Sequence, residues 1–159
     1  KTSTTMQTDK LILDNELFFA EVERMLSEEH FVTLRSKGSS MFPFITGGRD
    51  SVVLQKSRDI NAGDIVLARI PGKGHVLHRV YKADGDRLTL MGDGNLHAKE
   101  ECTKSDVAGK VTEIIRDGRH VHCSAPAERR KAAVWMKLLP VRRLLLCVCR
   151  IYVKLKQRK

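Results

Sequence analysis

The stretch GDIVLARIPGKGHVLHRVYKADGDRLTLMGDGN, residues 63–95, decides the fold class of this 159-residue chain. It contains three short strand-like runs, at residues 64–70, 75–81 and 87–92. The segments between the runs, PGKG and ADGD, are made of residues that favour tight turns. Strand-like runs joined by such turns are typical of antiparallel strands. The stretch therefore predicts antiparallel β-structure at the centre of the chain.

Similar strand-like runs lie on both sides of this stretch, at residues 31–35, 51–56 and 107–116. Clusters such as TGGRD and NAGD separate them, so turns recur about every ten residues. Several short strands at this spacing predict a mainly β fold, a compact antiparallel β-domain that we assign to residues 31–123. A chain of this length is the size of one domain and can bury a core without disulfides or metals.

Residues 1–30 are expected to form an N-terminal extension with an amphipathic helix. Between Leu11 and Glu29, apolar residues recur every three or four positions, which is the period of one helix face. The members of this stripe are Leu13, Leu17, Phe18, Val22, Met25 and Leu26.

The positive charge of the chain is confined to its C-terminal end. Residues 1–119 contain 18 Lys and Arg and 18 Asp and Glu, whereas residues 120–159 contain 11 basic residues and Glu128 as the one acid. The last segment therefore accounts for the whole net charge of +10. The pattern indicates a neutral domain followed by a basic tail, residues 124–159.

The basic tail is expected to be helical and amphipathic. Pro140 should divide it into two short helices. Its longest uncharged run, Leu144–Cys149, has six residues, whereas a transmembrane helix needs about 20 apolar ones, so no transmembrane segment is expected. Two interpretations stay open: a helix packed on the domain with a solvated basic face, or residues 129–159, with Trp135, lying on an anionic membrane surface. Nucleic acid is not an expected partner. The expected location is cytoplasmic or peripheral at a membrane surface.

The cysteines and the remaining histidines do not indicate a metal site. The four cysteines show neither metal-ligand spacing nor a disulfide pattern, which favours a reducing compartment. His120 and His122 form an H-x-H pair without a third ligand at suitable spacing. His75 and His97 are expected to be solvated loop residues. We therefore expect no metal and no cofactor.

The segment SKGSSMFPFI, residues 36–45, could present a nucleophile. Gly38 permits a tight backbone approach, Met41 can fill the core, and Pro43 restricts the chain after the turn. A serine hydroxyl becomes a useful nucleophile only when a base accepts its proton. Taken alone, the segment is equally consistent with a simple Gly-Ser turn.

Five short motifs in order give the segment a further meaning. Gly-x-Ser-Met-x-Pro is followed by GDIVLARI, LHRV, MGDGN and SDVAGKV. Over residues 32–115 this order resembles the signal peptidase I and LexA-type superfamily of serine peptidases. The resemblance implies the β-domain of that superfamily and Ser40, the serine before the methionine, as the nucleophile.

The motif LHRV places His78 where this superfamily carries its general base. Bacterial signal peptidases and LexA-type proteins have a lysine there, so the chain is most similar to the Ser-His branch of endoplasmic-reticulum-type signal peptidases. A histidine suits the role because its ordinary pKa is about 6.5 and needs no large shift. Outside this context, a histidine in a strand can equally be structural.

The supporting acid and the oxyanion donors are less well defined by the sequence. Asp93, in GDGN, is our first choice for the carboxylate that orients His78, and Asp106, in SDVAG, is the second. Either aspartate could instead cap backbone amides in a turn. The backbone N–H of Ser40 is the expected oxyanion donor. Ser39 or another backbone amide would provide the second donor, because Gly38 occupies the position of the hydroxyl in bacterial relatives.

Three functions are compatible with these residues. The first is a serine endopeptidase that cleaves an extended peptide or preprotein with small side chains beside the scissile bond. The second is a LexA-type regulator that cleaves itself, although residues 1–39 contain no Ala-Gly bond and too few helices for a DNA-binding unit. The third is a peptide-binding module of the same fold that has lost catalysis.

Overall fold

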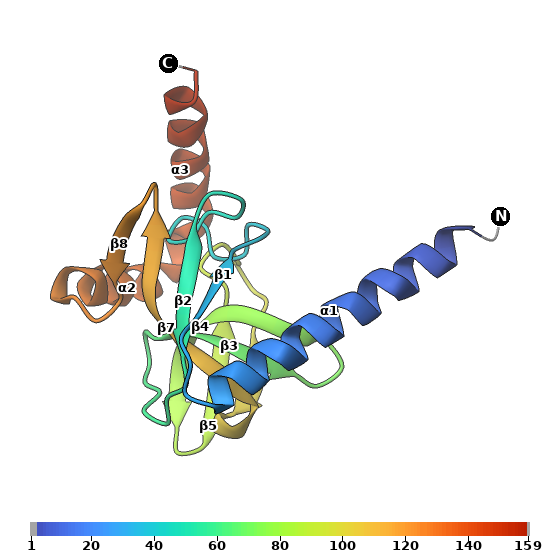
Figure 1. Cartoon of the computed structure of the whole chain (residues 1–159). Helices are drawn as coiled ribbons and strands as arrows, with labels where there is room; N and C mark the ends of the chain where they lie inside the picture. The colour runs from blue at the N-terminus through green and yellow to red at the C-terminus, as the bar shows by residue number, and fades with distance from the viewer. Residues whose placement is uncertain (1–2, 159) are drawn as a thin grey trace.

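A computed structural model describes the backbone of residues 3–158 and the side chains of residues 15–158. In this part of the chain, eight strands form one sheet, and every strand pair is antiparallel. The mainly β fold with an N-terminal and a C-terminal helical segment is therefore confirmed (Figure 1). The strands are β1 (Val32–Arg35), β2 (Ser51–Gln55), β3 (Ile65–Ile70), β4 (Gly74–Asp84), β5 (Arg87–Met91), β6 (Glu100–Thr103), β7 (Val107–Arg116) and β8 (Arg119–His122).

The six strands expected from the sequence are all present, whereas β6 and β8 are not apparent in the sequence. Their segments, EECT and RHVH, are short and mostly polar. Both are held by one neighbour, because β6 pairs with β5 and β8 pairs with β7. Pairing with an existing strand thus stabilises segments whose own composition does not favour β-structure.

The strand order is β1-β2-β7-β3-β4-β5-β6, with β8 beside β7. The long strand β7 joins the two halves, since it pairs with β2, β3 and β8. One cluster of buried side chains lies between α1 and the strands β1, β2 and β7, and the other lies among β3, β4 and β5. The strand β4, which carries the predicted base, lies inside the sheet between β3 and β5.

The helix α1 (Ser3–Ser27) confirms the predicted N-terminal helix and begins earlier than the apolar stripe. Val22 and Leu26 are buried in the core, but Leu17 and Phe18 are 63% and 52% exposed. Only the last turns of α1 therefore pack on the sheet, and the rest extends away from it (Figure 1). The side chain of Leu13, another member of the stripe, lies outside the described side chains.

The basic tail forms α2 (Pro126–Lys137), a short 3-10 turn (Leu139–Val141) and α3 (Arg142–Lys156). The predicted break at Pro140 is thus confirmed. Helices in the described residues 3–158 are all too short or too polar to cross a membrane.

The two tail helices differ in how they contact the domain. Trp135 of α2 is buried, and its Nε1–H donates to the carbonyl of Asp93 at 3.1 Å. Arg142, the first residue of α3, is fully buried between the rings of Tyr81 and Trp135. Beyond Leu146, α3 extends away from the sheet (Figure 1). The tryptophan that the sequence suggests for a membrane surface is therefore part of the protein core.

Candidate active site

The segment with Ser40 is a compact turn between β1 and β2. Ser36 links the two ends of the turn, because its N–H and its Oγ both donate hydrogen bonds to the carbonyl of Asp50, at 3.0 and 2.7 Å. Met41 and Ile45 are buried in the core cluster beneath α1, as expected for Met41. The turn is thus anchored on its inner side, while Ser39 is exposed and Ser40 is half-buried.

The buried carboxylate of Asp50 stiffens the end of this turn. It accepts hydrogen bonds from the N–H of Thr46 at 2.8 Å, from Arg49 at 2.7 Å and from Arg116 at 3.2 Å. Burial raises the pKa of Asp50, but these hydrogen bonds outweigh it and leave the pKa below its ordinary value. Asp50 therefore stays ionised at neutral pH and holds both ends of the turn.

The motif GDGN packs directly against the backbone of Ser39 and Ser40. The N–H of Gly94 donates to the carbonyl of Ser40 at 2.8 Å. A Cβ on Gly92 would lie 2.3 Å from that carbonyl oxygen, and one on Gly94 would lie 2.6 Å from the carbonyl oxygen of Ser39. Only glycine permits this close approach, so the GDGN motif packs directly against the backbone of the Ser40 turn.

His78 is paired with Glu100, a residue that the sequence analysis does not single out. His78 Nδ1 lies 2.8 Å from Glu100 Oε2, and both side chains are buried. A carboxylate only accepts hydrogen bonds, so Nδ1 carries the proton and Nε2 of the neutral ring is the acceptor. Glu100 also accepts a hydrogen bond from Lys73, at the β3–β4 turn. Burial raises the pKa of Glu100, but the hydrogen bonds from Lys73 and His78 have the larger effect. The pKa of Glu100 is therefore below its ordinary value.

The second nitrogen of His78 is open. Nε2 makes no hydrogen bond to a described residue. Among the described residues, the one side-chain nitrogen or oxygen that is both fully buried and unpaired is Arg142 Nε. His78 Nε2 is unpaired but is not such an atom, so it is in contact with solvent. Within the same part of the chain, Ser40 Oγ makes no hydrogen bond, to His78 or otherwise; such contacts often tighten only when substrate binds.

A small recess connects the Ser40 turn with the strand of His78. It has a volume of about 20 Å³ and is lined by Ser40, by Leu77, the neighbour of His78, and by Ser36, Lys37, Gly38, Met41, Ile45 and Gly47. This volume is about that of one water molecule or one methyl group. The recess beside Ser40 is therefore small, and Leu77 rather than His78 is the residue of β4 that lines it.

Asp93, the first-choice acid, does not contact His78. Its two carboxylate oxygens accept hydrogen bonds from Nε and Nη2 of Arg79, at 2.8 and 2.7 Å, and it is fully buried. Arg79 follows His78 in β4, and neighbouring side chains of a strand point to opposite faces of the sheet. Asp93 is consequently engaged on the face away from His78.

Asp106, the second choice, caps a short turn instead. Its Oδ2 accepts hydrogen bonds from the N–H and the hydroxyl of Thr103, at 2.8 and 2.9 Å. This is the turn-capping interpretation that the sequence left open for both aspartates. The carboxylate beside His78 is Glu100, in place of Asp93 or Asp106.

A signal for Glu100 is present in the sequence of β6. Side chains alternate along a strand, so Glu100 shares a face with Cys102, and both are buried while Glu101 is exposed. A carboxylate on a buried face requires a partner. Without the assignment of β6 as a strand, this alternation could not be recognised.

The expected oxyanion donors are the backbone N–H of Ser40 and a group of Ser39. In the described part of the chain, the backbone N–H of Ser40 donates to no carbonyl, so it is free to donate a hydrogen bond to a ligand oxygen. The side chain of Ser39 is exposed and makes no hydrogen bond to a described residue. The second donor that we expect from Ser39 stays a prediction.

Three of the other histidines have contacts within the fold, whereas His97 is an exposed loop residue, as expected. His75 is not a solvated loop residue, because it lies in β4, stacks on Phe19 with ring centroids 4.4 Å apart, and pairs with Glu23 of α1. His120 and His122 both face Glu113, with Nδ1 at 2.7 and 3.4 Å from its carboxylate. No group of three or more side chains with metal-binding geometry occurs among the described residues.

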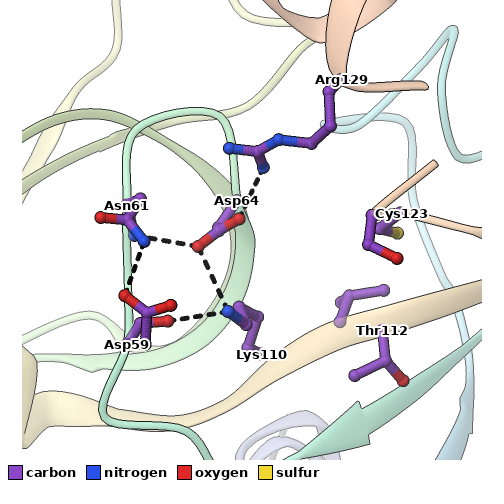
Figure 2. A pocket seen from close by; sticks show the side chains of 9 residues that line it. Asp59, Asn61, Asp64, Lys110, Thr112, Cys123 and Arg129 are labelled. Atoms are coloured by element: carbon purple, nitrogen blue, oxygen red, sulfur yellow. Dashed lines mark hydrogen bonds and ion pairs between the residues drawn. The ribbon is translucent and has the colours of Figure 1, made fainter. Parts of the chain in front are cut away.

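A larger pocket, of about 290 Å³, lies apart from Ser40 (Figure 2). It is formed by the loop before β3, by β7 and by the start of α2. Asp64 bridges Arg129 at 2.7 Å and Lys110 at 3.6 Å, and Lys110 also donates to the carbonyl of Asp59 (Figure 2). Its charged groups are thus paired with one another, and they fasten α2 to the domain.

A comparison with known families concerns the part of the chain that contains this candidate site. The family model described as Peptidase S24-like matches residues 4–112, a range that includes Ser40, His78 and Glu100. The basic tail lies outside the matched range. No curated protein matches the chain in sequence.

Proposed function

The chain belongs to the Peptidase S24-like family, and from this premise we propose that it is a serine endopeptidase of the Ser-His type found in endoplasmic-reticulum-type signal peptidases. In this proposal Ser40 is the nucleophile, His78 is the general base, and Glu100 takes the role that the sequence analysis gives to Asp93. The same family match is also compatible with a self-cleaving LexA-type protein. The observation that carries the proposal is the buried His78–Glu100 pair, in which Nδ1 is held by the carboxylate and Nε2 is unpaired; the recess beside Ser40 is lined by Leu77, the residue before His78, and not by His78 itself.

The proposed chemistry is that of other serine peptidases. His78 Nε2 accepts the proton of Ser40 Oγ while Oγ forms a bond to the carbonyl carbon of the peptide. The imidazolium then gives this proton to the leaving amine as the C–N bond breaks. Water, deprotonated by the same nitrogen, releases the acyl group from Ser40. Glu100 keeps the proton on Nδ1 and stabilises the imidazolium, while the N–H of Ser40 binds the oxyanion.

The recess beside Ser40 supports a substrate with a small side chain at the scissile bond. Its volume of about 20 Å³, close to that of one methyl group, suits glycine or alanine better than a longer side chain. The exposed backbone around Lys37 and Gly38 leaves room for an extended peptide next to the nucleophile. A preprotein or a dedicated peptide with a small residue at this position fits these features.

The proposal is tested by labelling the protein with a fluorophosphonate and measuring its intact mass. The wild-type chain should gain one adduct, located on the peptide that contains Ser40. Ser40→Ala should remove the adduct, whereas Ser39→Ala, a matched change at the exposed neighbour, should retain it. Labelling that persists in Ser40→Ala would overturn the assignment of the nucleophile.

The same mass measurements separate the alternative functions. Incubation of the chain alone should leave its mass unchanged if it acts on other peptides. Two complementary fragments that disappear in Ser40→Ala would show a self-cleaving protein. Absence of both an adduct and cleavage of peptides with small residues would identify a module that has lost catalysis.

A further inference from the structure

The helix α3 exposes one continuous apolar face. Its members lie at i, i+4, i+7, i+8 and i+11 and are each between 57% and 68% exposed: Leu144, Val148, Ile151, Tyr152 and Leu155. At 3.6 residues per turn, this spacing places them along one side of the helix. We call this set the α3 apolar face. A single exposed leucine is ordinary, but a contiguous face of five large apolar side chains indicates an interaction surface.

Basic side chains flank the α3 apolar face. Arg143, Arg150 and Lys154 are exposed on one flank, and α3 contains no acidic residue. The one acid of residues 120–159, Glu128, lies in α2 and is paired with Lys131 at 2.7 Å. The apolar face is therefore flanked by positive charge that has no acidic partner in the described part of the tail.

We propose that the α3 apolar face binds an anionic lipid bilayer, with α3 lying in the plane of the membrane surface. An amphipathic helix with large apolar residues on one side and lysine or arginine on the other is the form that inserts at the boundary of headgroups and acyl chains. Each basic side chain near such a surface strengthens binding about fivefold. The charge of α3 selects anionic over zwitterionic lipid.

A second copy of the chain is a poorer occupant of this face. Pairing of two α3 helices would bring their arginines and lysines together without any acidic residue to balance them. The helix also has 15 residues, about four turns, which is short for a two-stranded coiled coil. A lipid surface covers the apolar face and attracts the flanking charge at the same time.

The surface is restricted to α3 and does not extend over the whole basic tail. Ala132 and Trp135 of α2 are buried against the domain, and the start of α3 is fixed by Arg142. Arg142 Nη1 donates to the carbonyl of Asn95 at 3.2 Å, within the motif that supports the Ser40 turn. If the proposed function holds, a docked α3 brings peptides at the membrane surface close to Ser40.

The proposal is tested by sedimentation of the full chain with vesicles of phosphatidylglycerol and phosphatidylcholine, and with vesicles of phosphatidylcholine alone. We expect binding to the anionic vesicles and at least about tenfold weaker binding to the zwitterionic ones. Ile151→Glu should weaken binding to the anionic vesicles at least about tenfold. Val134→Glu is the matched control, because Val134 is a 55% exposed apolar residue of α2, and it should bind like the wild type.

A second pair of variants tests the charge. Replacement of Arg143, Arg150 and Lys154 by Gln should weaken binding more than tenfold, whereas the same change at three exposed arginines of the β-domain, Arg58, Arg69 and Arg87, should have little effect. These measurements need no peptide cleavage, so their outcome is independent of the proposed function.

Three results would overturn the proposal. One is equal binding of wild type and Ile151→Glu to anionic vesicles. Another is a concentration-dependent dimer that Ile151→Glu dissociates, without vesicle binding, which would assign the face to a second copy. The third is salt-sensitive binding of duplex DNA at physiological ionic strength with no binding to vesicles.

Discussion

Two neighbouring residues of β4, His78 and Arg79, each pair with a buried carboxylate, and the two pairs are built differently. Arg79 binds both oxygens of Asp93, donates to the carbonyl of Gly63 at 2.8 Å, and lies over the ring of Phe44. His78 binds Glu100 through Nδ1 and leaves Nε2 open. The first pair is saturated, whereas the second retains one unpaired acceptor.

The difference separates a structural pair from one that can do chemistry. A saturated, buried ion pair links parts of the fold but has no atom left for a substrate. An imidazole that is oriented by a carboxylate and still has a free nitrogen can accept a proton. Asp93 therefore joins β4 to the GDGN motif, and Glu100 is the carboxylate that orients His78, the proposed base.

The largest effect should come from breaking the saturated pair. Arg79→Met leaves Asp93 buried without its partner, and the free energy of unfolding should fall by about 3–5 kcal/mol. Urea denaturation measures this change. Arg24→Met is the matched control, because Arg24 pairs with Glu21 on the exposed surface of α1 and such pairs contribute little to stability. Equal losses in the two variants would contradict the structural role of Asp93.

An intermediate effect is expected from the open pair. Glu100→Gln keeps the shape of the side chain but removes the charge that supports the imidazolium, so the rate of fluorophosphonate labelling should fall at least about 100-fold, equivalent to about 2.7 kcal/mol of activation free energy. Far-UV circular dichroism should show a folded protein.

The control for this variant is Glu101→Gln, the same change at the exposed neighbour, which should label at the wild-type rate. Wild-type labelling of Glu100→Gln would show that Glu100 does not support His78. It would leave the nucleophile assignment untouched, since that depends on Ser40→Ala.

The smallest effect should come from Lys73, the second partner of Glu100. Its side chain is 53% exposed, so Lys73→Met should cost less than about 1 kcal/mol. Lys73 helps to lower the pKa of Glu100 below its ordinary value. The ionised carboxylate therefore stabilises the fold above the unfolded-state pKa, about 4.3, and this stabilisation is lost as the pH falls through the lower folded-state value.

Removal of Lys73 raises the pKa of Glu100 toward its ordinary value, so part of this pH-dependent stabilisation disappears. Unfolding free energies at pH 7 and pH 3 should differ less in Lys73→Met than in the wild type. An unchanged or larger difference would contradict the contribution of Lys73 to the pair.

Much of the fold could be predicted because its signals are local. The turn motifs around residues 63–95 and the short apolar runs identify six strands, and the stripe of α1 and the break at Pro140 are equally local. The strands β6 and β8 could not be predicted, since they depend on pairing with β5 and β7. The exposure of Leu17 and Phe18 could not be predicted either, because periodicity shows that a helix face is apolar but does not show which part of the fold covers it.

The order of short motifs along the chain was enough to single out Ser40 and His78 as candidates and to assign the mainly β fold, because residue type and spacing carry that information. The choice among Glu100, Asp93 and Asp106 was decided only by the tertiary structure. Strand register and the alternation of side chains on β4 direct His78 to one face of the sheet and Arg79 to the other, and β6 brings Glu100 to the face of His78. Which carboxylate meets a histidine depends on distances across the sheet, and a linear sequence does not contain them.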